Sequence, residues 1–181
     1  MGRIGVLVSG QGTNLQALID AGLPVRAVVS NRSGVPALHR AARAGIESAV
    51  FAAGDYGSRE ERDAVMAAWL EEREVTLVVC AGFMELLRKP FLERFAGRIL
   101  NTHSAPLPDF PGARPIEDVL AAGVAETAAT VHYVDEGTDT GPVIAAERVP
   151  VYEDDTAETL RARVQSVEHR LLPRIVRSLA G

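Results

Sequence analysis

The first hundred residues alternate short, nearly continuous apolar runs with segments of helical periodicity, and this alternation constrains the fold more than any other feature. Four runs rich in valine are predicted to be buried strands, at residues 3–9, 25–30, 47–52 and 75–81. The segments between them have helical patterns, and two of these end on Gly22 and Gly45. Such strand–helix alternation predicts a parallel sheet.

The second half of the chain changes this pattern. A short strand at 98–100 leads into a loop at 101–112, whose prolines and glycine exclude a helix or a central strand, and a helix is expected near 114–122. Two alternating runs, 128–137 and 142–151, resemble a strand pair, and a long closing helix is expected after Thr156 as its cap. We therefore predict one α/β domain over 1–181: a Rossmann-like open twisted sheet, parallel in its N-terminal half, with late antiparallel strands and a long C-terminal helix.

Composition directs attention to small-molecule chemistry. The 181 residues are 47% hydrophobic, enough for one substantial core, and the net charge of −5 argues against nucleic-acid binding, which needs a basic surface. The first apolar run ends after about five residues, too short for a signal sequence or a membrane span, so we expect a cytoplasmic protein without membrane contact. The single Cys80 is expected to be a buried hydrophobe, and the four histidines lack metal-binding spacing, so no metal is expected.

A glycine-rich turn, SGQGTNLQ at 9–16, follows the first predicted strand. Gly10 and Gly12 match part of the dinucleotide fingerprint, but Leu15 stands where its third glycine should be, and no Gly-Lys-Ser/Thr follows. The exposed amides of a helix N-terminus at Thr13 and Asn14 would still suit a single phosphate. The alternative is a tight turn in which Thr13 or Asn14 only caps the helix, and this stretch alone does not separate the two interpretations.

The loop at 101–112 begins with Asn101 and His103, which are separated by one residue. In an extended segment their side chains leave on the same side, so an amide donor and an imidazole donor can converge on one oxygen atom. Asp139, in a glycine-rich loop between the two late strands, is the nearest carboxylate that could meet them, and it would favour the imidazolium form of His103. The three would form an acyl-transfer site with oxyanion donors and an acid–base group. Taken singly, each could instead be a turn residue or a hydrogen-bonded histidine.

Five segments in order, SGQGTNLQALID, AGFMELL, NTHSAPLPDFPG, VHYVDEGTDTGPVI and RVQSVEH, resemble the motifs of the phosphoribosylglycinamide formyltransferases. The likeness covers nearly the whole chain. It implies the formyltransferase fold, with a nucleotide-binding half at 1–100 and a catalytic and folate-binding half at 101–181. It also implies that the glycinamide amine attacks the formyl carbon of 10-formyltetrahydrofolate in purine biosynthesis, with no metal. By position, Asn101 and His103 would stabilise the oxyanion, His103 would donate a proton, and Asp139 would hold His103 protonated.

The resemblance also implies the binding residues. For the ribonucleotide they are Gly12, Thr13, Asn14 and Glu168, the last contacting the ribose, although a glutamate on an amphipathic helix is more often a plain surface residue. For the folate they are Arg59, Met84, Glu85, Leu86, Leu87, Asn101, Val134 and Asp139. Both partners are small molecules, and a homodimer is left open.

Three positions depart from the family pattern: Glu85 stands where arginine is common, Ser104 replaces a proline, and the segment 112–120 lacks a histidine. Two relatives remain as alternatives. Formyltetrahydrofolate hydrolase lets water attack but carries an extra N-terminal regulatory domain, and methionyl-tRNA formyltransferase adds a C-terminal RNA-binding domain. These 181 residues are expected to contain neither. A folate- or nucleotide-binding module without catalysis is the third alternative, and a proton donor with a tuning carboxylate argues against it.

Overall fold

The computed structural model describes residues 2–181 as a seven-stranded sheet with the order β3-β2-β1-β4-β5-β6-β7. The strands are β1 (Ile4–Val8), β2 (Val25–Ser30), β3 (Glu47–Val50), β4 (Leu77–Cys80), β5 (Ile99–His103), β6 (Glu126–Tyr133) and β7 (Val143–Pro150). The first five are parallel, whereas β6 runs antiparallel to β5 and β7 antiparallel to β6. The predicted fold class is confirmed.

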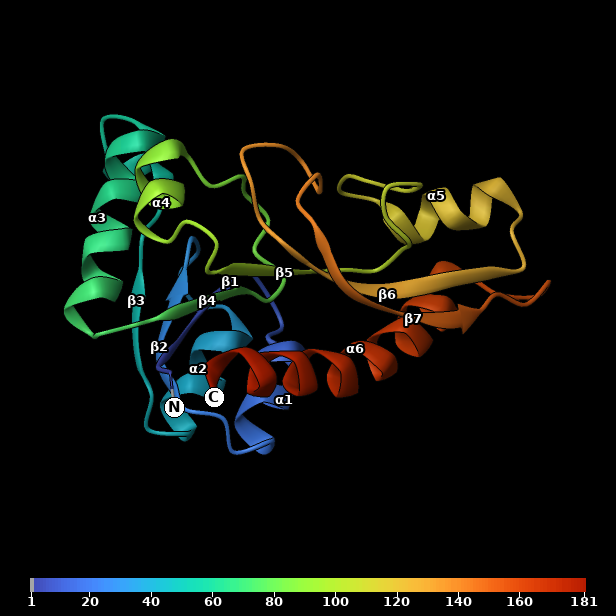
Figure 1. Ribbon diagram of the computed structural model, residues 1–181, viewed down its shortest axis with the longest axis horizontal. Helices are drawn as coiled ribbons and strands as arrows, with labels where there is room; N and C mark the ends of the chain where they lie inside the picture. Colours follow the sequence, from blue (N-terminus) through green and yellow to red (C-terminus); the bar gives the residue numbers. More distant parts are fainter. Residues whose placement is uncertain (1) are drawn as a thin grey trace.

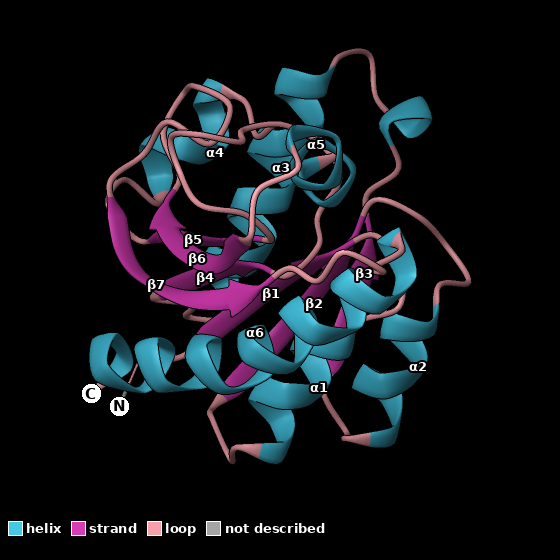
Figure 2. Cartoon of the chain, turned by 90° about the vertical axis from the view of Figure 1, so that its right-hand side faces the viewer, coloured by secondary structure: helices cyan, strands magenta, loops and turns pink. Residues whose placement is uncertain are grey.

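Helices cover both faces of this sheet. They are α1 (Thr13–Asp20), α2 (Pro36–Arg43), α3 (Arg59–Glu72), α4 (Lys89–Arg94), α5 (Pro115–Ala122) and α6 (Ala157–Ala180), with a 3₁₀ turn, η1, at Ala53–Asp55. Figures 1 and 2 show α3 and α4 on one face, and α1, α2 and α6 on the other. Helix α6 begins as predicted, because the Thr156 hydroxyl accepts a hydrogen bond from the Thr159 amide.

Two apolar clusters, one for each face, form the core. One joins the sheet to α1, α2, α5 and α6, and the other packs Met66 and Leu70 of α3 and Phe91 of α4 against the opposite face. All five residues of β1 are buried, as are all four of β4. Burial on both faces is the reason that these strands are continuously apolar rather than alternating.

Two local predictions need correction, and one helix was not predicted. Strand β5 continues through Asn101 to His103, because the first proline of the following loop stands only at position 106. Neither Thr13 nor Asn14 caps α1; the cap position is Gly12, with a left-handed φ of 70°. The short helix α4, which begins with a proline in its first turn, was not predicted.

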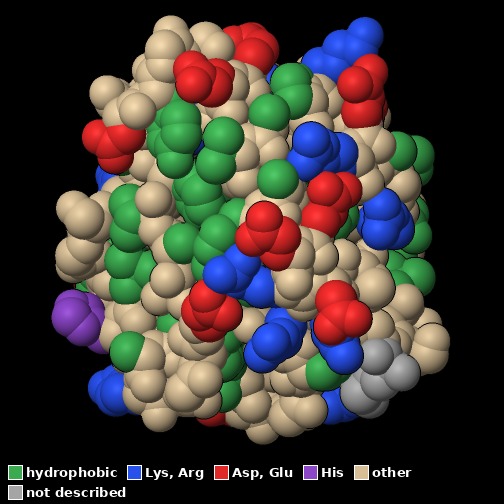
Figure 3. All heavy atoms as spheres, turned by 90° about the vertical axis from the view of Figure 1, so that its left-hand side faces the viewer, with side chains coloured by type: hydrophobic (Ala, Val, Ile, Leu, Met, Phe, Trp, Pro, Cys, Tyr) green, Lys and Arg blue, Asp and Glu red, His purple; other side chains and the backbone are tan. Residues whose placement is uncertain are grey.

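The surface of the described residues adds two findings. No helix within residues 2–181 is long and apolar enough to cross a bilayer. On the face that Figure 3 shows, acidic and basic side chains are intermixed with hydrophobic ones, so this face lacks the single-signed basic patch that nucleic acids bind.

Candidate active site

A cavity of about 740 Å³ lies where β1, β4 and β5 end. Its walls are the turn after β1, the segment 81–87 after β4, the end of β5, the β6–β7 loop and one side of α6. Carboxyl ends of neighbouring parallel strands meet at one edge of a sheet, which is where open α/β folds bind ligands. The volume is in the range of small-molecule sites.

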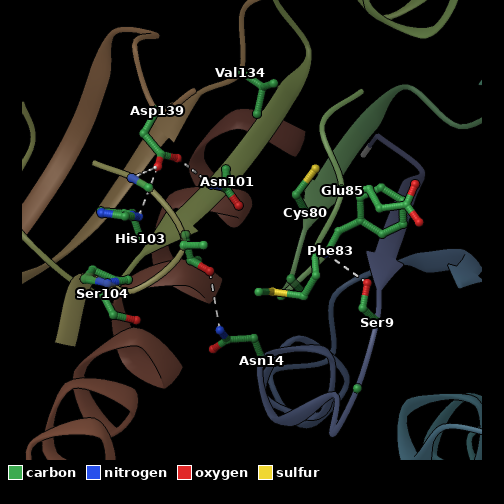
Figure 4. A pocket seen from close by; sticks show the side chains of 18 of the residues that line it. Ser9, Asn14, Cys80, Phe83, Glu85, Asn101, His103, Ser104, Val134 and Asp139 are labelled. Carbon is green, nitrogen blue, oxygen red and sulfur yellow. Dashed lines mark hydrogen bonds and ion pairs between the residues drawn. The ribbon is translucent and has the colours of Figure 1, made fainter. Parts of the chain in front are cut away.

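Asn101, His103 and Asp139 meet on one side of this cavity, as Figure 4 shows. Asp139 Oδ2 lies 3.5 Å from His103 Nδ1, and Asn101 Nδ2 donates to Asp139 Oδ1 at 3.4 Å. The amide of Gly112 also donates to Asp139 Oδ2, at 2.9 Å. The β6–β7 loop thus folds back over β5, and the three residues predicted to act together are brought together.

The charge of Asp139 is maintained by its surroundings. Burial by itself raises the pKa of Asp139, but the imidazoles of His132 and His103 beside it and the hydrogen bond from the Gly112 amide outweigh burial, so the pKa lies below its usual value. Asp139 has a left-handed φ of 54°, a conformation that aspartate tolerates better than most residues. The cavity therefore contains an ionised carboxylate beside an imidazole.

His103 is oriented at both ring nitrogens. Its Nε2 lies 2.5 Å from the carbonyl oxygen of Phe110, which can only accept, so Nε2 carries the hydrogen of that bond. Nδ1 faces Asp139, and the histidine is only 5% exposed. A proton on Nδ1 as well would give an imidazolium bonded on both sides.

Sequence reasoning missed His132. This residue of β6 lies directly opposite Asn101 in the antiparallel pair, with Nε2 3.2 Å from Asn101 Nδ2 and 3.5 Å from Asp139 Oδ1. Its position two residues before Val134 gives no signal by itself. The register between β5 and β6 would have been needed to find it.

The residues predicted for the ribonucleotide, Gly12, Thr13, Asn14 and Glu168, also line the cavity and adjoin the end of β5. A side chain on Gly12 would place its Cβ 2.6 Å from that of Ala37, so this position requires glycine for space as well as for its φ. The side chain of Glu168 is buried, not on the surface, and both its oxygens accept hydrogen bonds: Ser104 Oγ at 2.7 Å and Asn14 Nδ2 at 3.0 Å. Within residues 2–181, Asn14 Oδ1 is buried and finds no donor, which leaves it free for a donor of a ligand.

Met84 to Leu87 and Val134, predicted to frame the folate, line the cavity as a third group. The side chains of Met84 and Leu86 are 60% and 49% exposed, whereas apolar side chains that only pack in the core are buried. The Met84 amide donates to Ser9 Oγ at 2.9 Å, and this bond joins the segment to the residue that follows β1. Arg59, at the start of α3, is exposed and is not among the lining residues, but its charge acts on Glu85 of this group and helps to lower the pKa of Glu85.

Glu85 has an additional structural role. It forms an ion pair with Arg62, whose side chain is fully buried and also pairs with Asp63 at 2.7 Å, and it accepts a hydrogen bond from Asn31 at 2.7 Å. Burial raises the pKa of Glu85, but the bonds from Asn31 and Arg62 and the charge of Arg62 more than offset this, so the pKa is lowered. Asp63 in turn accepts from the Arg88 amide at 2.6 Å. The bond from Met84 to Ser9 and the bond from Arg88 to Asp63 thus hold the two ends of segment 84–88 in place.

Cys80 and possible metal ligands are the other groups that bear on the chemistry of this cavity. Burial raises the pKa of the Cys80 thiol to about 12, so this lining residue is not a thiolate nucleophile at neutral pH. Across residues 2–181, no group of three or more His, Cys, Asp or Glu side chains is arranged to hold a metal ion.

The open sheet and the cavity at its carboxyl edge define an α/β enzyme whose amide, imidazole and carboxylate suit acyl transfer. A family model described as formyl transferase matches residues 2–176. The chain belongs to the formyl transferase family.

Similar proteins agree with this assignment. The chain is 45% identical to a phosphoribosylglycinamide formyltransferase of Mycobacterium tuberculosis, over 98% of this chain and 85% of that protein. It is also 45% identical to the trifunctional purine biosynthetic protein adenosine-3 of Gallus gallus, and it spans only 14–18% of the length of such trifunctional relatives.

Solved structures show the same likeness. A phosphoribosylglycinamide formyltransferase from Streptococcus pneumoniae superposes with a TM-score of 0.95 at 40% identity, covering 99% of both chains. A glycinamide ribonucleotide transformylase from Geobacillus kaustophilus superposes with a TM-score of 0.97 at 40% identity, covering 100% of both chains.

Proposed function

We propose that this protein transfers the formyl group of 10-formyltetrahydrofolate to the amine of glycinamide ribonucleotide, in purine biosynthesis. The observation that carries the proposal is the meeting of Asn101, His103 and Asp139 in one cavity. The identity of the two substrates is inferred from the relatives named phosphoribosylglycinamide formyltransferase.

In the proposed reaction the amine nitrogen attacks the formyl carbon, and a carbon–nitrogen bond forms as the carbonyl oxygen becomes an oxyanion. Asn101 and His103 donate hydrogen bonds to this oxyanion, and for this the Nε2–H of His103 exchanges its bond to the Phe110 carbonyl for one to the oxyanion. Such stabilisation is usually the largest catalytic term. The attacking nitrogen loses a proton, N10 of the folate gains one, and the bond from carbon to N10 breaks. His103 supplies the proton, Asp139 favours its protonated form, and Asp139 with water carries the proton lost by the amine.

Each side of the cavity receives one substrate in this proposal. The amides of Gly12, Thr13 and Asn14, at the N-terminus of α1, hold the phosphate. The carboxylate of Glu168 accepts from the ribose hydroxyls, for which it is well oriented because Ser104 and Asn14 hold both its oxygens.

The folate lies against the opposite side. Segment 84–87 and Val134 frame the pterin, chiefly through backbone groups, and Arg59 lies toward the benzoyl-glutamate end, where an exposed arginine can reach a ligand that extends out of the cavity. Residues 1–100 then form the nucleotide-binding half and residues 101–181 the catalytic and folate-binding half of one domain. In this proposal segment 84–87, which lines the cavity, adds a contribution of the first half to the folate side.

The experiment that tests the function mixes purified protein with 10-formyltetrahydrofolate, with and without glycinamide ribonucleotide, and follows tetrahydrofolate release and the fate of the formyl group. An amine that is held beside the formyl carbon reacts faster than free water, because proximity lowers the barrier. Tetrahydrofolate release without the ribonucleotide should therefore be at most about a hundredth of the rate with it. The formyl group should appear on the nucleotide. Rapid formate production that ignores added ribonucleotide would instead identify a hydrolase.

Location and assembly complete the proposal. We propose a cytoplasmic enzyme, and a thiol at Cys80 that is buried and unpaired in the described residues suits a reducing compartment. A homodimer is the oligomeric state to test, by light scattering of the purified chain.

A further inference from the structure

The hydrogen bonds of His132 define a role that the reaction described above does not use. The ring is 2% exposed and lies on β6 beside Asn101 of β5. Its Nδ1 is 2.8 Å from the carbonyl oxygen of Tyr133. A carbonyl only accepts, so Nδ1 carries a hydrogen, and in the neutral ring Nε2 must then be an acceptor.

This acceptor faces the amide of Asn101. Nε2 of His132 is 3.2 Å from Asn101 Nδ2, and Asp139 Oδ1 is 3.4 Å from the same nitrogen. Two acceptors on one side leave only one favourable orientation for the amide, because turning it over would place its oxygen against a lone pair and a carboxylate. The amide nitrogen, and not the oxygen, is therefore held on this side.

We propose that neutral His132 is a positioning residue that orients the Asn101 amide for oxyanion binding. One N–H bond of Asn101 goes to His132. The other makes only the long 3.4 Å contact with Asp139, so it is available to turn to the formyl oxygen when substrate is bound. This inference rests on the proposed formyl transfer.

Protonation of His132 would reverse this arrangement. Its Nε2 would become a donor to Asp139 Oδ1, 3.5 Å away, and would favour the oxygen of Asn101 in place of the nitrogen. The charged groups around the ring are Asp139 and Asp135 from the β6–β7 loop, together with His103, which shares Asp139. A protonated ring no longer accepts from the Asn101 amide, so activity should fall in acid.

Two variants separate positioning from simple packing. His132→Gln keeps an acceptor near the place of Nε2, whereas His132→Leu removes it and keeps bulk. The leucine variant should lose at least about tenfold in kcat, the scale of one lost hydrogen bond in a transition state, with KM for both substrates within about threefold. The glutamine variant should keep most of kcat and lose the part of the acid decline that comes from His132.

A double-mutant cycle tests the route through Asn101. In an Asn101→Ala background, His132→Leu should change kcat by less than about twofold, because the group it positions is gone. An equal loss in both backgrounds would overturn the proposal, as would an unchanged kcat in a folded leucine variant. If the leucine variant does not fold, the glutamine variant decides: kcat near wild type supports the proposal and a loss of tenfold overturns it.

A second measurement does not depend on the substrates. In ¹⁵N-labelled protein at pH 8, NMR should show His132 as the tautomer with hydrogen on Nδ1 and a bare Nε2. The other tautomer would overturn the inference even if formyl transfer is observed, whereas absent transfer with the expected tautomer would contradict only the proposed function.

Discussion

Asp139→Asn is the most direct perturbation of the candidate site. The substitution keeps the size of the side chain and its tolerance of a left-handed backbone, at φ 54°, so the loop should keep its shape. The asparagine oxygen can still accept from the Gly112 amide, which is 2.9 Å from the present carboxylate. The negative charge beside His103 and His132 is lost.

The expected magnitudes follow from these contacts. Loss of acid–base assistance should lower kcat by at least about a hundredfold, or about 2.7 kcal/mol of transition-state stabilisation. The Nδ2 group of the new asparagine would also face Asn101 Nδ2, a donor against a donor, so the Asn101 amide should lose its present orientation. Stability should change by only about 1 kcal/mol, which for a domain of this size is a shift of roughly 2–4 °C in Tm.

Single-turnover formyl transfer separates the chemical step from binding, and calorimetry with the folate verifies that the cleft is intact. Asp109→Asn is the matched control, since it removes the same charge from an exposed residue that does not line the cavity. It should leave kcat unchanged. Unaltered turnover in a folded Asp139→Asn protein would refute the assignment of this carboxylate to the chemistry.

Three further predictions concern the two binding sides. Gly12→Asp should weaken ribonucleotide binding strongly and leave folate affinity nearly unchanged, because it adds bulk 2.6 Å from Ala37 and negative charge where the phosphate would lie; calorimetry showing the reverse would mean that the two sides are exchanged. Ser104→Ala should raise KM for the ribonucleotide by roughly threefold to tenfold through loss of its bond to Glu168, and an equal rise in the KM for folate would contradict this. Glu85→Gln should lower Tm by roughly 3–10 °C by leaving buried Arg62 without one charged partner. Since the folded pKa of Glu85 lies below its unfolded value of about 4.3, its contribution is present above that pH and lost in acid, so the wild-type advantage in Tm should shrink below about pH 4.

Most of the fold could be predicted because its determinants are local. The continuous apolar runs at β1, β2 and β4 require burial on both faces, and alternation with helices then leaves a parallel sheet as the simplest solution. The ends of the helices and strands were predicted less accurately. Strand β5 extends to His103 since pairing with β6 stabilises it as far as that residue, and this pairing is not visible in the local sequence.

The candidate site was predictable where residues are close in sequence or matched a family motif. Asn101 and His103 share a face because of their spacing in an extended segment, and the structure shows them on one strand. His132 depends on strand register, which a single sequence does not specify. Burial of Glu168 depends on packing of α6 against α1, so its helical pattern alone could not distinguish it from a surface glutamate.

Glu85 and Ser104, which depart from the family pattern, have a common physical explanation. Each residue has a polar partner that is itself buried: Arg62 for Glu85 and Glu168 for Ser104. A fully buried arginine is strongly unfavourable unless its charge is matched, and the short bond of Ser104 satisfies one oxygen of a buried carboxylate. Glu85 and Ser104 therefore stabilise the positions of segment 84–88 and of Glu168, which contribute to the lining of the proposed substrate sites. The resemblance to the family did not reveal their buried partners, Arg62 and Glu168.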